Sequence, residues 1–286
     1  MRHGPAVRRR KLGEELRRLR LAAGLTSRDA GRLAGWHQSK VSRIETGVSG
    51  VRADDVTRLL DVYQIDDPQL RVLLQTLTGA ADGLGHGWWH AYRGLIPPEY
   101  QDFISLEAQA HLARTLETSV VPGLLQTPQY ARAVTGAVLE ELPAAAVDSL
   151  VEVRLARQEV LYGESPLSLS VVLDEAVLRR EVGGARVMRD QLRRLTELAQ
   201  LPHVRLQVLP FGGGGYVGLT GPFVIFSFLN TSDLDVVVLD HLTSTLYLER
   251  KEDLEVYCAA FERMQARALT PEDSLELIAR IGDGAR

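Results

Sequence analysis

Three residues at a fixed spacing constrain the N-terminal part of the chain more than any other feature. Gly31, Gly35 and Val41 follow one another at offsets of four and six residues. A glycine at the first position lets a second helix cross close to the first, and a glycine at the second tolerates the positive φ of a tight turn. Val41, together with Ile44, would fasten the second helix to a core. The spacing predicts two short helices joined by a tight turn, a helix-turn-helix over residues 26–47.

The flanking sequence supplies further helices around this motif. Leu12, Leu16 and Leu19 recur at helical spacing and give one apolar stripe on a helix that Gly24 ends. Thr26 opens the next helix in an S/T-x-x-D/E capping relation. Apolar periodicity and turn residues predict three more helices, near 38–45, 53–63 and 68–77. We therefore expect residues 1–78 to form a compact all-α domain of five helices.

Charge is distributed unevenly along the chain. The formal net charge of the 286 residues is −4, which taken alone argues against a nucleic-acid partner. Residues 1–50, however, contain 12 Lys and Arg against 4 Asp and Glu, whereas residues 78–286 contain 18 against 28. A basic N-terminal part (the head) followed by an acidic remainder (the body) is the asymmetry expected when only the head contacts the phosphates of DNA. The alternative is that the basic residues form a solvated face with no partner.

The segment GLTSRDAGRLAGWHQSKVSRIETG (24–47) resembles the Xre/Cro family of helix-turn-helix regulators, and the resemblance extends over about residues 11–77. In that family the second motif helix enters the major groove of double-stranded DNA and its N-terminal residues meet base edges. The resemblance thereby implies a set of DNA-binding residues in this chain. These are Ser27, His37, Gln38, Ser39, Lys40, Ser42 and Arg43.

The side-chain chemistry of these positions suggests separate roles. Gln38 can bond adenine bidentately and Arg43 can bond guanine, whereas Ser39 suits a base or a phosphate. Lys40 is better suited to neutralising phosphate, because an ammonium group on a flexible stem has little directional preference. Ser27 stands where the family often has Gln, and its shorter hydroxyl would still reach a phosphate.

Other residues of the head are expected to be structural. Arg20 and Glu45 match positions that pair with each other in the family and tie the first helix to the recognition helix. Trp36, at the turn, is expected to fill the core rather than stack on bases. Two roles are left open for His37, which are capping its helix and contacting a base. Two interpretations are left open for the basic arm at 8–11, which either contacts DNA or is a solvated tail.

A glycine-rich segment, GAADGLGHG (79–87), reads as a linker to a second domain over residues 88–286. Helical patterns near 102–118, 128–139, 143–162 and 184–200 alternate there with runs typical of strands. The strand-like runs are 167–174, 204–211, 223–229 and 235–240, with 245–249 expected to pair after the last. Helices near 251–268 and 271–281 close the chain, so the second domain is predicted to be α+β.

The second domain offers only weak signals for an active site. Asp174 and Glu175 are adjacent carboxylates after a strand, but adjacent side chains point apart, so helix capping suits them better than acid–base chemistry. FGGGGYVG (211–218) lacks the Lys-Ser/Thr of a phosphate-binding loop. His86 and His90 are four residues apart in a glycine-rich context with no third ligand. We expect no enzyme activity, no cofactor and no metal site.

The bulk sequence indicates a cytoplasmic protein. No apolar run approaches the roughly 18 residues of a membrane span, and the basic N-terminus has no apolar segment behind it as a secretory signal would. A single cysteine, Cys258, excludes an intrachain disulfide. We therefore expect no membrane partner.

Several segments of the second domain are similar to one actinobacterial, antitoxin-like group of regulators, which join an Xre-type head to a large C-terminal domain of uncharacterised role. The segments are VPGLLQTPQYARAV (121–134), RQEVL (157–161), VVLDEAVLRREVGG (171–184), QLRRL…LPHVRLQVLP (191–210), GPFVIFSF (221–228) and ALTPEDSLELI (268–278). The similarity implies a domain that binds a small partner protein or senses an effector. The expected function is a homodimeric, sequence-specific transcription regulator. The alternative is an antitoxin-like interaction module that sequesters a small protein, with DNA binding secondary.

Overall fold

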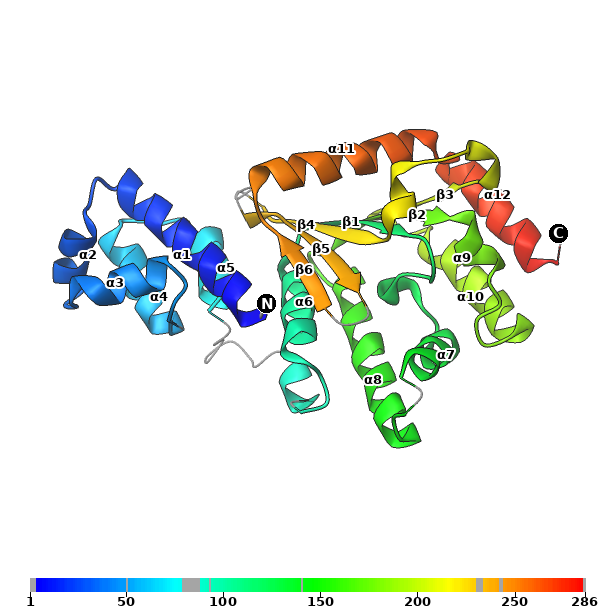
Figure 1. Cartoon of the computed structure of the whole chain (residues 1–286), viewed down its shortest axis with the longest axis horizontal. Coiled ribbons are helices and arrows are strands. Elements are labelled where there is room, and N and C mark those ends of the chain that lie inside the picture. Colours follow the sequence, from blue (N-terminus) through cyan, green and yellow to red (C-terminus); the bar gives the residue numbers. More distant parts are fainter. Residues whose placement is uncertain are drawn as a thin grey trace. The chain divides into compact units, whose positions relative to one another are not determined.

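The computed structural model describes residues 4–49, 51–78, 88–92, 94–139, 141–229, 234–241 and 244–284 (Figure 1). The predicted linker at 79–87 lies outside these residues. Contacts divide the chain into two units, residues 1–105 with 230–234 and residues 106–229 with 235–286. The first unit holds the helical head and the second a mixed sheet with its helices, an α+β body as the sequence predicts.

The head consists of five short helices whose ends follow the local sequence signals. They are α1 (Gly4–Ala22), α2 (Ser27–Leu33), α3 (Gln38–Glu45), α4 (Ala53–Val62) and α5 (Pro68–Thr76). Thr26 caps α2, and its hydroxyl accepts from the Asp29 amide while the Asp29 carboxylate accepts from the Thr26 amide. The capping box predicted from the sequence is therefore confirmed. Gly24 and Gly35 both have φ +70°, as the ends of α1 and α2 require.

Helices α1 and α3 approach each other through a glycine. A Cβ built on Gly13 of α1 would lie 2.5 Å from the carbonyl oxygen of Ile44 and 2.6 Å from that of Glu45. Leu12 and Leu16, on either side of this contact in α1, are completely buried, as is Val41 of α3. The head thus needs a residue without a side chain at position 13, because the obstructing atoms belong to the backbone of α3.

The body is built on a six-stranded sheet with the order β3-β2-β1-β4-β5-β6. Its strands are β1 (Leu112–Glu117), β2 (Ser168–Asp174), β3 (Val204–Leu209), β4 (Phe223–Ser227), β5 (Val236–His241) and β6 (Ser244–Leu248). β1, β2 and β3 run parallel, whereas β4 pairs antiparallel with β1 and β5. β6 pairs antiparallel with β5, which confirms the predicted pairing of this last strand.

Helices and short 3-10 turns make up the rest of the described chain after the head. They are η1 (Trp88–Tyr92), α6 (Pro98–Gln109), η2 (Gly123–Leu125), α7 (Pro128–Val138), α8 (Ala144–Arg157), η3 (Gln158–Leu161), α9 (Glu175–Arg179), α10 (Ala185–Leu198), η4 (Phe211–Gly213), η5 (Val217–Thr220), α11 (Lys251–Arg267) and α12 (Pro271–Gly282). α11 lies along one face of the sheet (Figure 1), where Phe261 and Met264 pack against Leu116, Val172 and Ile225. The start of α12 and the residues just before it cover the outer edge of β3: the Leu269 amide donates to the Val208 carbonyl, and the Ser274 hydroxyl accepts from the Val208 amide.

One predicted element of the body is wrong. The helical pattern assigned to 102–118 divides in the structure into the helix α6, which ends at Gln109, and the strand β1. Leu112 and Leu116 are four residues apart, which suits a helix as well as a strand. β1 lies in the interior of the sheet between β2 and β4, and it carries Arg114 on one face and Thr115 and Glu117 on the other, so no apolar–polar alternation identifies it. The short helix α9 was also not predicted as an element, although capping at Asp174 was.

Substitution of Gly13 by Ala should destabilise the helical head. The new methyl group would meet backbone atoms that cannot rotate away, and overpacking of this kind costs about 1–3 kcal/mol. The measurement is thermal unfolding of the full chain followed by circular dichroism. Gly136→Ala, in α7, is the control, because nothing lies within 4 Å of its added Cβ. An unchanged melting temperature for Gly13→Ala would contradict the packing described for α1 and α3.

Candidate nucleic-acid interface

The turn between α2 and α3 is shaped by close backbone contacts. A Cβ on Gly31 would lie 3.0 Å from the carbonyl oxygen of Trp36 and 3.2 Å from the amide nitrogen of Gln38. The Trp36 amide donates to the Gly31 carbonyl at 2.7 Å, which pulls the turn back onto α2. The roles assigned to Gly31 and Gly35 from their spacing are therefore confirmed, and α3 begins at Gln38 in a fixed position against α2.

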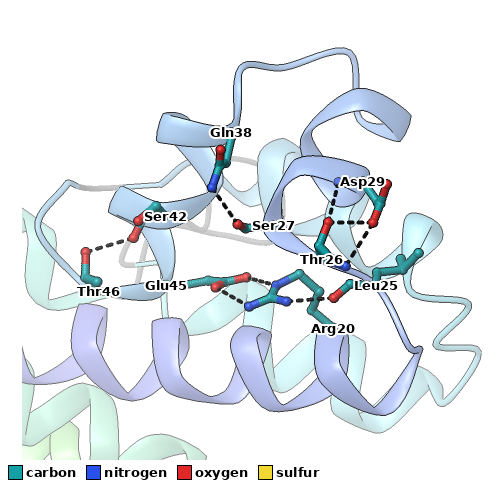
Figure 2. A network of polar contacts seen from close by, with 9 residues as sticks. All are labelled: Arg20, Leu25, Thr26, Ser27, Asp29, Gln38, Ser42, Glu45 and Thr46. Atoms are coloured by element: carbon teal, nitrogen blue, oxygen red, sulfur yellow. Dashed lines mark hydrogen bonds and ion pairs between the residues drawn. The ribbon is translucent and has the colours of Figure 1, made fainter.

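A buried ion pair holds α3 against α1, as Figure 2 shows. Arg20 Nε donates to Glu45 Oε1 at 2.6 Å, and a second guanidinium nitrogen donates to Oε2 at 2.9 Å. The third nitrogen donates to the Leu25 carbonyl at 2.7 Å, which adds the segment before α2 to the same contact. The hydrogen bond to Glu45 raises the pKa of Arg20. The predicted Arg20–Glu45 pair is confirmed.

The remaining face of α3 is open. Successive residues of an α-helix are rotated by about 100°, so Ser39, Ser42 and Arg43 share one side. All three are exposed, whereas Val41, Ile44 and Glu45 on the other side are buried. Among the described residues the Arg43 guanidinium has no hydrogen-bond or ion-pair partner. α3 therefore presents two hydroxyls and one uncommitted cation to its surroundings.

Gln38 lies at the flank of this exposed face, next to α2 (Figure 2). Its side-chain nitrogen donates to the Ser27 hydroxyl at 3.0 Å. This bond leaves the Gln38 side-chain oxygen and its second N–H available. Two predicted DNA-binding residues from different helices are thus brought together, one fixing the orientation of the other.

His37 caps α3. Its Nδ1 accepts from the Ser39 amide at 3.2 Å and lies 2.9 Å from the Ser39 hydroxyl. The alternatives left open by the sequence were helix capping and base contact, and capping is what the structure shows. Because Nδ1 accepts the amide hydrogen, only Nε2 of this ring can donate outward.

Lys40 occupies the opposite flank of α3, next to α4. Its ammonium group lies 3.8 Å from the centre of the Trp36 ring and donates to Asp55 Oδ1 at 2.9 Å. Trp36 is only partly buried, so its assignment as a core residue is wrong: one face of its ring carries the lysine instead. Asp55 was not among the site residues expected from the sequence, because an aspartate in the first turn of a helix has an ordinary capping role.

The basic arm is partly placed by the structure. The backbone at 8–11 belongs to α1, which begins at Gly4, while the side chains of these residues lie outside the described part of the structure. Contact of the arm with DNA stays a prediction, as do the DNA contacts of Ser27, His37, Gln38, Ser39, Lys40, Ser42 and Arg43.

The carboxylates that the sequence singled out in the body have structural partners. Asp174 accepts from the Ala176 amide at 2.8 Å and caps α9, and it also accepts from the Tyr216 hydroxyl. Glu175 pairs with Arg179 and accepts from the Phe211 amide. The capping role predicted for this pair is confirmed at Asp174.

Glu117 is a carboxylate of the body whose pKa is shifted. Burial raises the pKa of Glu117, at the carboxyl end of β1, to about 8. Sequence reasoning missed it because β1 was taken for part of a helix.

His86 lies outside the described residues, as does the side chain of His90. Within the described ranges no three His, Cys, Asp or Glu side chains gather to hold a metal ion, and no helix there is both long and apolar enough to cross a membrane.

The geometry of the head defines a helix-turn-helix, and comparison with known families agrees. Residues 11–73 match a family described as "Helix-turn-helix domain", which indicates DNA binding and transcription regulation. Residues 100–280, more than half of the chain, match the family described as "Domain of unknown function (DUF5753)". The chain belongs to this DUF5753 family. Neither the comparison with curated proteins nor that with solved structures found a match.

Loss of one partner of the Arg20–Glu45 pair should strongly destabilise the head. Arg20→Met leaves the Glu45 carboxylate buried without its counter-ion, which costs about 3–5 kcal/mol. The double variant Arg20→Met/Glu45→Gln should recover a large part of that loss in urea unfolding. Asp61→Asn, which breaks an exposed pair with Arg71, serves as the control and should cost less than about 1 kcal/mol. Equal effects of Arg20→Met and Asp61→Asn would refute the structural role of the buried pair.

Proposed function

We propose that this protein is a sequence-specific, DNA-binding transcription regulator of the Xre type, with α3 as its recognition helix. The observation that carries the proposal is the exposed face of α3. Ser39, Ser42 and Arg43 project from a helix whose opposite side is locked by buried apolar contacts and by the Arg20–Glu45 pair. A rigid helix with polar side chains free on one face suits readout in the major groove.

Arg43 and Gln38, the two residues best suited to contact bases, differ in whether the side chain already has a hydrogen-bond partner. Arg43 has a guanidinium without a partner among the described residues, which can bond O6 and N7 of guanine bidentately. Gln38 already donates one N–H to Ser27, which leaves its oxygen to accept from N6 of adenine and its second N–H to donate to N7. Ser27 therefore supports the proposed adenine contact by fixing the rotation of the Gln38 amide.

The proposed active form is a homodimer. A single head of five helices can contact only one half-site, and helix-turn-helix proteins commonly bind pseudo-palindromic operators as two-fold dimers. The basic residues concentrated in the first 50 positions would then supply phosphate contacts from two heads.

We propose a regulatory rather than catalytic role for the body. The two adjacent carboxylates that suggested acid–base chemistry are engaged in capping and ion pairing, at Asp174 and Glu175. The excess of acidic residues over 78–286 disfavours contact of this region with DNA. Its resemblance to antitoxin-like regulators of actinobacteria supports binding of a small partner protein or an effector, and a body of this size is compatible with sequestering such a protein.

The first test is selection of binding sites from a random duplex library by the full chain. Enrichment of a two-fold repeated sequence would support the proposal in full. Enrichment of one unrepeated half-site would refute the dimer, and no enrichment would refute sequence-specific binding.

Arg43→Ala should remove discrimination at one position of the selected site. The loss of a bidentate contact to guanine is expected to cost about 1–3 kcal/mol of preference for the correct base. Competition binding between the selected site and single-base variants measures this preference. Arg193→Ala, a substitution in α10 of an exposed arginine paired at 3.4 Å with Asp190, is the control and should leave the preference unchanged. A full preference in Arg43→Ala would exclude Arg43 as a base reader.

Ser27 and Gln38 should act as one unit. Gln38→Ala should lower the preference for adenine at its position, and Ser27→Ala should lower it less, since the Gln38 amide loses its support but keeps its chemistry. In Gln38→Ala the further change Ser27→Ala should have little additional effect on base preference. Additive losses of base preference in this double-mutant cycle would instead assign Ser27 a base contact of its own.

A further inference from the structure

Lys40 differs from Arg43, the other cation of α3, because its charge is already compensated. Arg43 is exposed and has no side-chain partner among the described residues. The Lys40 ammonium, by contrast, is held between the Trp36 ring at 3.8 Å and Asp55 Oδ1 at 2.9 Å. The Lys40 and Asp55 side chains are 36% and 23% exposed, so the pair is half-buried rather than loose on the surface.

This geometry matters for DNA because affinity for a duplex depends on uncompensated positive charge. Each phosphate that a cation neutralises releases counterions from the DNA. A lysine that is paired with a carboxylate must give up this partner before it neutralises a phosphate. If it does not give up the partner, the carboxylate itself lies close to the phosphate and repels it.

The position of the pair makes the competition direct. Lys40 is the third residue of α3, and Asp55 lies in the first turn of α4. Because successive residues of a helix are rotated by about 100°, Lys40 lies at the flank of the exposed face that Ser39 and Arg43 occupy. When a helix lies in the major groove, its flanks are next to the phosphate backbone. The Trp36 ring holds the ammonium from another side, so exchange of Asp55 for phosphate needs only a small movement of the lysine.

We propose that Asp55 is a built-in competitor of DNA phosphate for Lys40 and limits the affinity of the head for DNA. This inference rests on the proposed function. With Asp55 in place, Lys40 contributes almost no net charge to binding. Without the carboxylate, Lys40 becomes a full phosphate-binding cation, and Trp36 keeps it positioned.

The experiment compares Asp55→Asn with Asp54→Asn in the full chain. Both residues lie in the first turn of α4 and both variants remove one negative charge, but Asp54 is exposed and does not contact Lys40. The probe is a labelled duplex of scrambled sequence, and binding is measured by fluorescence anisotropy between about 50 and 200 mM salt.

Asp55→Asn should bind this duplex about three- to tenfold more tightly than the wild-type chain at the lowest salt. Its plot of log affinity against log salt concentration should be steeper by about 0.9, the value for one additional neutralised phosphate. Asp54→Asn should gain less affinity and keep the wild-type slope. In a Lys40→Met background, Asp55→Asn should lose its advantage over Asp54→Asn.

Three outcomes would overturn the inference. Equal gains and slopes for the two variants would mean that Asp55 acts only through general charge. Weaker binding by Asp55→Asn would mean that Asp55 instead positions Lys40 for its phosphate. Absence of binding by the wild-type chain and by every variant would refute the proposed DNA-binding function and the inference together, whereas the first two outcomes refute the inference alone.

Discussion

The helical head depends on the contact between Arg20 and Glu45. Apolar burial draws α1 and α3 together but has no directional preference, whereas a bidentate pair fixes their relative rotation and register. The same guanidinium also bonds the Leu25 carbonyl, so the chain entering α2 is tied to the same point. In this arrangement the backbone of α3 comes close to Gly13 of α1, and the turn before it comes close to Gly31 of α2. The exposed face of α3 is thus the outer side of a rigid unit.

The polar side chains on that outer side of α3 differ in whether a neighbouring helix holds them in place. Gln38 and Lys40 flank the exposed face and each is held by a neighbouring helix, through Ser27 of α2 and Asp55 of α4. Arg43 is held by nothing among the described residues. The ends of α3 are secured by His37 at its start and by Thr46, whose hydroxyl donates to the Ser42 carbonyl (Figure 2). Base reading and phosphate binding are therefore divided between side chains with different freedom to move.

The sequence predicted those features whose signal is local. Caps, turns and helical stripes specify the head almost to its boundaries, and the glycine spacing specifies the crossing of α2 and α3. Features that depend on distant partners were missed. Gly13 looks like an unfavourable residue within a helix until the backbone of α3 is seen beside it. Asp55 looks like an ordinary first-turn carboxylate until Lys40 is placed against it. Leu112–Glu117 reads as helix because polar residues occur on both faces of this strand, so no apolar–polar alternation reveals its period.

The position of β1 in the sheet bears on how the chain acquires its structure during synthesis. β1 pairs with β2, where Leu112 faces Ser168, and with β4, where the same residue faces Ser227. Both pairings join segments that are far apart in sequence, so the body has a high contact order and cannot complete its sheet until most of the chain has been made. The five helices of the head, by contrast, pack on one another and all lie before residue 78. A nascent chain therefore presents a folded head well before its body, and any control exerted by the body over the head begins only when synthesis is nearly complete.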